Sequence, residues 1–87
     1  MKNMVVNMDG WFGKVIDYKT GKKSSLCPGC NMIKVKILGY TELLESDPFN
    51  EFTKRDYPIG NIILANERQF KPYPEYVGFK CGEWVKA

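Results

Sequence analysis

The chain has 87 residues, of which 44% are hydrophobic and 26% are charged, and its net charge at pH 7 is +3. This composition is too apolar for a disordered chain, and the length suits one small domain spanning residues 1–87. No apolar run reaches the ~20 residues of a membrane span, and the first residues lack the apolar core of a signal peptide. We expect a cytoplasmic protein with no membrane partner and, given an odd number of cysteines, reduced thiols.

The charge is divided unevenly along the chain. Residues 1–40 carry seven lysines against two acids, whereas residues 41–87 carry four lysines and two arginines against eight acids. The acids Glu42, Glu45, Asp47 and Glu51 follow one another with no basic residue between them. This asymmetry predicts a dipolar molecule and a charged partner, although it is also typical of two solvated faces that keep a protein soluble.

Two strands are predicted in the N-terminal half. The first runs from Lys14 to Tyr18 in a segment rich in β-forming residues, and it ends in a turn at Thr20 and Gly21. The second follows the cysteines, where Ile33, Val35 and Ile37 alternate with Lys34 and Lys36. A period of two places the apolar side chains on one face and the lysines on the other. We expect Gly39 to end this strand or to mark a bulge.

A short helix is predicted in the middle of the chain. Asp47 and Pro48 form a favourable N-cap and first turn, so the helix is expected from Pro48 to Lys54, ending well before Pro58. Phe49 and Phe52 stand three residues apart and are expected to share its buried face.

The C-terminal third returns to β-structure. Residues 59–64 form an apolar run that predicts a strand, and Asn66-Glu67 is expected to turn. Pro72 and Pro74 make "KPYPEY" an edge strand or an extended connection, and "YVGFKCGEWV" predicts one or two last strands. About five short strands and one helix predict a mainly-β domain, a small curled sheet or barrel of SH3-like or OB-like type.

The stretch "SSLCPGCNM" has the composition of a chemical site. Pro28 and Gly29 between Cys27 and Cys30 suit the turn of half a zinc knuckle. A complete zinc site would need Cys81 and a fourth ligand from Asp, Glu, water or a partner, because the chain has no histidine. A redox dithiol would need a helix after the motif, where strand is predicted. We favour a third interpretation, a turn with packed thiols, and expect no zinc and no other cofactor.

Catalytic patterns are sparse in the sequence. The usual general base near neutral pH is absent without histidine, and neither glycine-rich phosphate-binding motif occurs. We therefore expect a protein that is not an enzyme.

Two sets of residues are candidates for a binding surface. The leading hypothesis is a small protein-binding module, an adaptor or inhibitor, because tyrosine and tryptophan often anchor protein interfaces. Phe79 and Trp84 are expected in the core, and the expected contacts are Phe70, Tyr73, Tyr76, Glu42 and Glu45.

The alternative is a nucleic-acid-binding β-barrel that uses the basic N-terminal half. Lysines would neutralise phosphates, and an exposed aromatic ring would stack on a base. The residues assigned to this surface are Lys19, Lys22, Lys23, Lys34, Lys36 and Trp11. A zinc-knuckle domain built on the cysteines is the second alternative.

Overall fold

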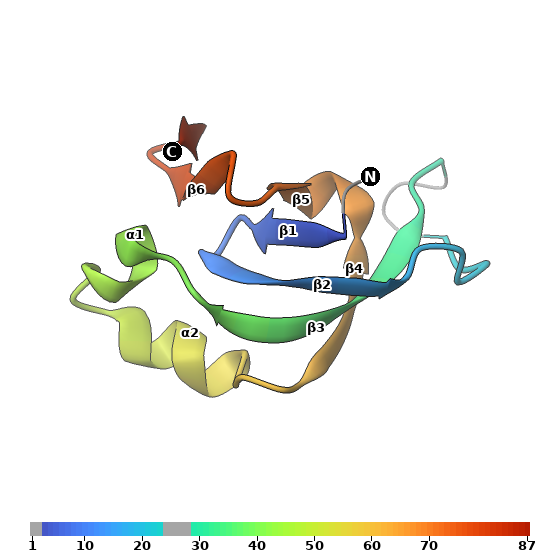
Figure 1. Cartoon of the computed structure of the whole chain (residues 1–87), viewed down its shortest axis with the longest axis horizontal. Coiled ribbons are helices and arrows are strands. Elements are labelled where there is room, and N and C mark those ends of the chain that lie inside the picture. Colours follow the sequence, from blue (N-terminus) through green and yellow to red (C-terminus); the bar gives the residue numbers. More distant parts are fainter. Residues whose placement is uncertain (1–2, 24–28) are drawn as a thin grey trace.

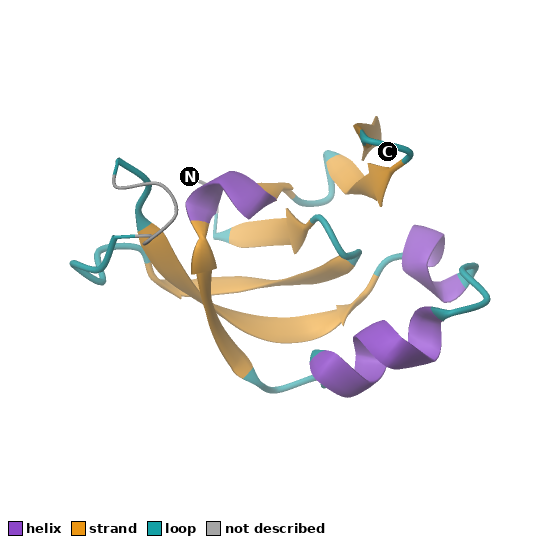
Figure 2. Ribbon diagram, turned by 180° about the vertical axis from the view of Figure 1, so that it is seen from behind, coloured by secondary structure: helices purple, strands orange, loops and turns teal. Residues whose placement is uncertain are grey.

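The computed structural model describes residues 3–23 and 29–87 of the chain. Strands dominate it: three precede a central pair of short helices along the chain and four follow them (Figures 1 and 2). The elements in chain order are β1 (Met4–Asn7), β2 (Trp11–Asp17), β3 (Met32–Tyr40), α1 (Glu42–Glu45), α2 (Asn50–Asp56), β4 (Ile62–Asn66), the 3₁₀ turn η1 (Glu67–Gln69), β5 (Phe70–Pro72), β6 (Tyr76–Lys80) and β7 (Glu83–Lys86).

Five strands form one antiparallel sheet in the order β4-β3-β2-β1-β5, and β6 pairs with β7 as a separate hairpin. The mainly-β prediction is confirmed. The sheet curls around its core, but no ladder joins β4 to β5 in the described part of the chain, so it does not close. The first four strands form a meander, and the fifth returns beside the first through η1.

The core lies on the concave side of the sheet. Trp11 is at its centre, 5.5 Å from Tyr57 and 5.5 Å from Phe70 between ring centroids. The other buried members of the cluster are Val5, Ile33, Val35 and Ile37. The alternation predicted for β3 is therefore confirmed, since its aliphatic side chains are buried while Lys34 and Lys36 are exposed.

Two bulges adjust the register between β2 and β3. Phe12 pairs with Gly39 and Gly13 pairs with Ile37, which leaves Leu38 as the extra residue. Gly39 lies against the Phe12 ring, since a Cβ there would be 2.7 Å from Phe12 Cζ. The bulge expected at Gly39 thus lies one residue earlier, at Leu38, and β3 continues past Gly39 to Tyr40. The second shift makes Ile16 an extra residue, and both extra side chains are exposed.

The helical region differs from the prediction. Helix α2 begins at Asn50 instead of Pro48, since Pro48 and Phe49 form a turn and Phe49 has non-helical backbone angles. Asp47 Oδ1 does accept a hydrogen bond from the Phe49 N–H, which is the bond expected of the predicted N-cap. Phe49 and Phe52 do not share a buried face; they are 69% and 50% exposed. Helix α1, which the sequence analysis missed, is capped by the buried Thr41 side chain, which accepts from the Leu44 N–H.

Other boundaries shift by a few residues. β1 was not predicted, β2 begins three residues before Lys14, and the apolar run 59–64 becomes strand only from Ile62. One or two last strands were predicted, and the structure has two, β6 and β7, which pair as a hairpin. It turns at Cys81 and Gly82, which have left-handed φ values of 53° and 82°.

Candidate functional site

One side of strands β2, β3 and β4 faces away from the core. The helices and the hairpin leave its side chains exposed. We call it the outer face and define it by seven exposed side chains. They are Lys14, Ile16, Lys34, Lys36, Leu38, Ile62 and Leu64. Basic and aliphatic groups therefore share a surface opposite the core.

The strand register places these side chains in rows. Lys14 is directly opposite Lys36, which is directly opposite Ile62 on the next strand. In the adjacent row, Lys34 is opposite Leu64. Directly opposed residues on one face have Cβ atoms about 4.5–5.5 Å apart, so Ile62 and Leu64 on β4 each border a lysine on β3.

The lysines of the outer face have no acidic partner within the described residues. The salt bridges found there join Lys54 to Glu45 and Arg55 to Asp56. Asp17 is opposite Lys34 in the register and its Oδ1 accepts a hydrogen bond from the Lys19 N–H, but no ion pair between Asp17 and Lys34 occurs among the described residues. The outer face therefore carries positive charge that residues 3–23 and 29–87 do not neutralise by ion pairing.

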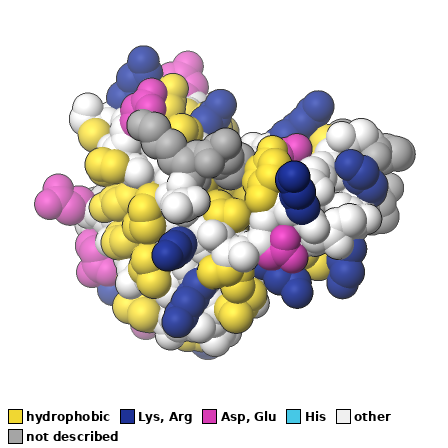
Figure 3. Space-filling view, turned by 45° about the vertical axis from the view of Figure 1, so that its right-hand side comes forward, with side chains coloured by type: hydrophobic (Ala, Val, Ile, Leu, Met, Phe, Trp, Pro, Cys, Tyr) yellow, Lys and Arg dark blue, Asp and Glu magenta, His cyan; other side chains and the backbone are white. Residues whose placement is uncertain are grey.

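The aliphatic side chains of the outer face are unusually accessible for their type. Ile62 is 57% exposed, Ile16 46% and Leu38 41%. A space-filling view shows apolar side chains in groups at the surface, with basic side chains between them (Figure 3). Ile62 and Leu64 are neighbours on the same face of β4, and exposed apolar side chains that gather in this way are typical of an interaction surface.

The basic residues assigned to nucleic acid divide between two places. Lys34 and Lys36 belong to the outer face, whereas Lys19, Lys22 and Lys23 are exposed on the β2–β3 connection. This connection projects at one end of the molecule, and the acidic segment of α1 and α2 lies at the other end (Figure 1).

Trp11 does not belong to a nucleic-acid surface, which corrects its assignment. It is fully buried, because it is the side chain around which the sheet curls. Its Nε1 is buried and has no hydrogen-bond partner among the described residues.

The expected protein-binding aromatics are mostly engaged within the fold. Phe70 is 4% exposed and belongs to the core, so its assignment to a binding surface is corrected. Tyr73 stacks on Phe12 with ring centroids 4.3 Å apart. Tyr76 packs edge-on against Trp84. Phe79 also packs against Trp84, and all of these rings except Phe70 are half-buried.

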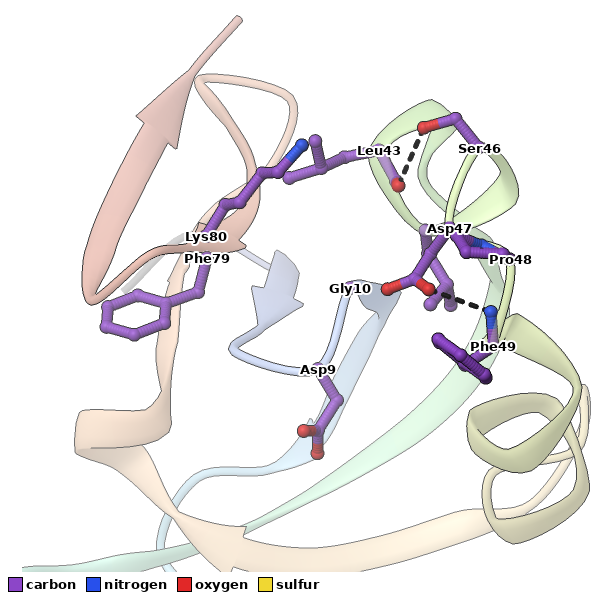
Figure 4. Close-up of a pocket in the computed structure, with 10 residues that line it drawn as sticks. Asp9, Gly10, Leu43, Ser46, Asp47, Pro48, Phe49, Phe79 and Lys80 are labelled. Atoms are coloured by element: carbon purple, nitrogen blue, oxygen red, sulfur yellow. Dashed lines mark hydrogen bonds between the residues drawn. The ribbon is translucent and has the colours of Figure 1, made fainter.

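Two cavities adjoin helix α1. One, of about 340 Å³, lies between the β1–β2 turn, the segment after α1, and β6 (Figure 4). Asp9, Asp47 and Lys80 give it charged groups, and Phe49 and Phe79 give it apolar ones.

The second cavity, of about 510 Å³, is lined by Glu42 and Tyr73 among others, so these two predicted contact residues are brought together. Glu45 is instead paired with Lys54 at 2.7 Å.

Asp9 also affects the pKa of Tyr57, a residue packed against the core. Burial raises the pKa of Tyr57 above its ordinary value, and the nearby Asp9 carboxylate raises it further. At the other end of the sheet the Tyr18 hydroxyl donates to Glu67 Oε2 at 2.6 Å, a hydrogen bond that raises the pKa of Tyr18.

The cysteines do not assemble a metal site among the described residues, where no group of three metal-ligating side chains occurs. Cys81 is free and exposed in the β6–β7 turn. Cys30 is buried and disulfide-bonded, so the expectation of reduced thiols is wrong for this residue. Cys27 lies outside the described residues, and so does most of the predicted cysteine turn.

Five residues of the outer face were not predicted as surface residues: Lys14, Ile16, Leu38, Ile62 and Leu64. Ile62, Ile63 and Leu64 form an apolar run, which is typical of a strand buried on both faces. Only the register with β3 shows that Ile63 faces the core while its two neighbours face outward.

Comparisons with protein-family models, curated proteins and solved structures find no significant match to this chain. In residues 3–23 and 29–87, no helix has the length and apolar character needed to cross a bilayer.

Proposed function

We propose that this chain is a small non-enzymatic protein-binding module, an adaptor or inhibitor, that binds its partner through the outer face. The observation that carries the proposal is the exposure of Ile62 and Leu64 directly beside Lys36 and Lys34. Burying apolar surface supplies about 25 cal/mol per Å² and is the main favourable term in protein association. The lysines would add orientation and selectivity for an acidic partner surface.

The proposal moves the binding surface from the C-terminal aromatics to the sheet. Tyr73 and Tyr76 already contact aromatic rings of the same chain, so part of their apolar surface is used within the fold. Ile62 and Leu64 are more exposed than Tyr73 and Tyr76, and they do not pack in the core. A partner that covers this area would remove it from water.

Nucleic acid is the second candidate, and a specific observation supports it. Lysines on β2, β3 and their connection are all exposed: Lys14, Lys19, Lys22, Lys23, Lys34 and Lys36. Aliphatic side chains, however, do not stack on bases as aromatic rings do. Tyr18, an exposed aromatic nearby, hydrogen-bonds the Glu67 carboxylate, which would repel a phosphate backbone.

A pull-down from an extract of the source cells, with and without nuclease, tests the proposal. The bait is the wild-type protein or the double variant Ile62→Thr/Leu64→Thr, in which threonine at position 62 keeps a β-branched side chain. Met8→Ser is the matched control, because Met8 is also exposed but lies in the β1–β2 turn. We expect a discrete protein that survives nuclease and is lost only with the double variant.

Salt dependence separates the two candidates. Binding through several phosphates weakens steeply and almost log-linearly with salt, and Lys→Ala changes at positions 19, 22 and 23 would reduce that slope. An interface centred on Ile62 and Leu64 should depend less on salt. Loss of all captured material on nuclease treatment, together with the steep slope, would favour nucleic acid and overturn the proposal.

A further inference from the structure

The two edges of the five-stranded sheet are built differently. The edge strand β5 has three residues and includes Lys71 and Pro72, which are features that discourage pairing with another strand. The opposite edge, β4, has five residues with the sequence Ile-Ile-Leu-Ala-Asn, without a charge or a proline. Natural sheets protect an exposed apolar edge, so an edge left in this state is a candidate for strand addition.

The backbone of β4 has one side available for such pairing. Ile37 N–H donates to the Asn61 carbonyl at 2.8 Å, which fixes the phase of the β3–β4 ladder. Hydrogen bonding alternates along an antiparallel strand, so Ile63 directs its N–H and C=O toward β3 while Ile62 and Leu64 direct theirs away. No second strand pairs with β4 within the described residues.

Charge next to this edge indicates the kind of segment that would add. A new strand would lie about 5 Å from β4 and roughly 10 Å from β3. Its outward side chains would extend the rows that contain Lys36 with Ile62 and Lys34 with Leu64. Long lysine side chains can cross the intervening aliphatic residue, and Lys14 adds positive charge behind Lys36. Acidic side chains on the new strand would therefore be attracted.

We propose that β4 is the docking edge for an extended acidic segment of the partner protein, which adds as a sixth strand to the sheet. Backbone hydrogen bonds to Ile62 and Leu64 hold the segment, and its carboxylates face Lys34 and Lys36. This inference rests on the proposed function, since it specifies how the partner engages the outer face.

Synthetic peptides test the inference without knowledge of the natural partner. The probe is a short peptide of alternating Glu and Val, compared with its Lys-for-Glu counterpart and with a version N-methylated at alternate residues to block one edge. Titration followed by amide hydrogen exchange gives both affinity and location. We expect the N-methylated and Lys peptides to bind at least about 10-fold more weakly, because each removes hydrogen bonds or reverses the charge.

Hydrogen exchange and a variant locate the binding to the edge. Exchange at the Leu64 amide should slow on binding, while exchange at Ile63, already paired with β3, should change little. Leu64→Pro removes an outward donor and leaves the β3–β4 ladder intact, because proline is accepted on an edge strand where its nitrogen faces solvent. This variant should fold and lose the peptide. If it does not fold, the N-methylated peptide makes the same test on the wild-type protein.

Several outcomes would overturn the inference. Equal affinity for the N-methylated peptide would show that backbone pairing is not used, and equal affinity for the Lys peptide would show that charge does not select the segment. Self-association through β4, detected by sedimentation, would assign the edge to a second copy of the chain. Displacement of the peptide by an oligonucleotide, but not by an acidic protein, would assign it to nucleic acid. No peptide binding, with the extract protein still captured through Ile62 and Leu64, would reject strand addition and keep the proposed function.

Discussion

Lys14 and Lys36 lie directly opposite each other on β2 and β3, and both side chains are exposed on the outer face. Like charges in this position destabilise a sheet, and no acidic side chain of the described residues forms an ion pair with either one. Repulsion between the two lysines therefore destabilises the free protein locally. Carboxylates of the proposed partner would reduce this repulsion.

The pair gives a stability prediction that is independent of any partner. Lys14→Glu places opposite charges across the two strands, and we expect the free energy of unfolding to rise by about 0.5–1 kcal/mol at low salt. Lys22→Glu makes the same charge change on the exposed β2–β3 connection and should have a smaller effect. Urea denaturation measures both, and the gain should shrink in 1 M salt because of screening. An unchanged or lowered stability for Lys14→Glu would contradict the observed register.

Gly13 gives a prediction about how closely the strands approach. A Cβ at this position would overlap the Lys36 carbonyl oxygen and the Val35 side chain. We expect Gly13→Ala to lower the free energy of unfolding by about 1–3 kcal/mol or more, because backbone cannot move away as a flexible side chain can. Gly29→Ala is the control, since nothing lies within 4 Å of its added Cβ. Equal stability of the two variants in urea would show that β2 and β3 are not packed as described.

Phe52 in α2 is exposed and Phe70 is buried, so their replacement should change the stability of the protein by different amounts. Phe70→Ala should cost about 3–5 kcal/mol of stability, because the ring is buried against Trp11. Phe52→Ala should cost much less, since its ring is half exposed and contacts Arg55 at 5.4 Å from the ring centroid. Thermal unfolding of the two variants checks this. A large loss with Phe52→Ala would mean that α2 buries the face expected from the sequence.

Tyr57 predicts an alkaline dependence of stability. Burial and the Asp9 carboxylate raise its pKa above 10.0, so the folded state favours the neutral phenol. Stability from this group is fully present below pH 10 and is lost as pH rises through the pKa of the folded protein. Asp9→Asn should lower the Tyr57 pKa while burial keeps it above the ordinary value. Tyrosinate absorbance, with Tyr57→Phe as the reference, measures this; titration of Tyr57 at or below 10.0 would contradict it.

Local patterns predicted part of the fold because they depend on neighbouring residues alone. The alternation in β3 places Ile33, Val35 and Ile37 inside, since a strand has a period of two and one face is buried. The β6–β7 hairpin could also be expected from its sequence. The start of α2 at Asn50 could not, because the capping pattern at Asp47 and Pro48 does not reveal that Phe49 leaves the helical conformation.

Of the outer face, the alternation in β3 predicted only Lys34 and Lys36; the residues that β2 and β4 contribute could not be predicted, because they depend on register between strands. A shift by one residue moves a side chain to the other face of a sheet, and the bulges at Ile16 and Leu38 produce two such shifts. Likewise, only the curl of the sheet buries Trp11 and Phe70, which as isolated aromatic residues suited an exposed binding surface equally well.

Photo-cross-linking from β4 tests the central claim most directly. A photoreactive phenylalanine analogue replaces Leu64 on the outer face or, as the control, Glu83 on β7, where the side chain is also exposed. The proteins are irradiated in an extract of the source cells after nuclease treatment. We predict a discrete protein adduct from position 64 and none from position 83. Excess wild-type protein should suppress this adduct by competition, whereas excess Ile62→Thr/Leu64→Thr variant should not. The absence of an adduct at position 64, or the same adduct from both positions, would contradict binding through the outer face.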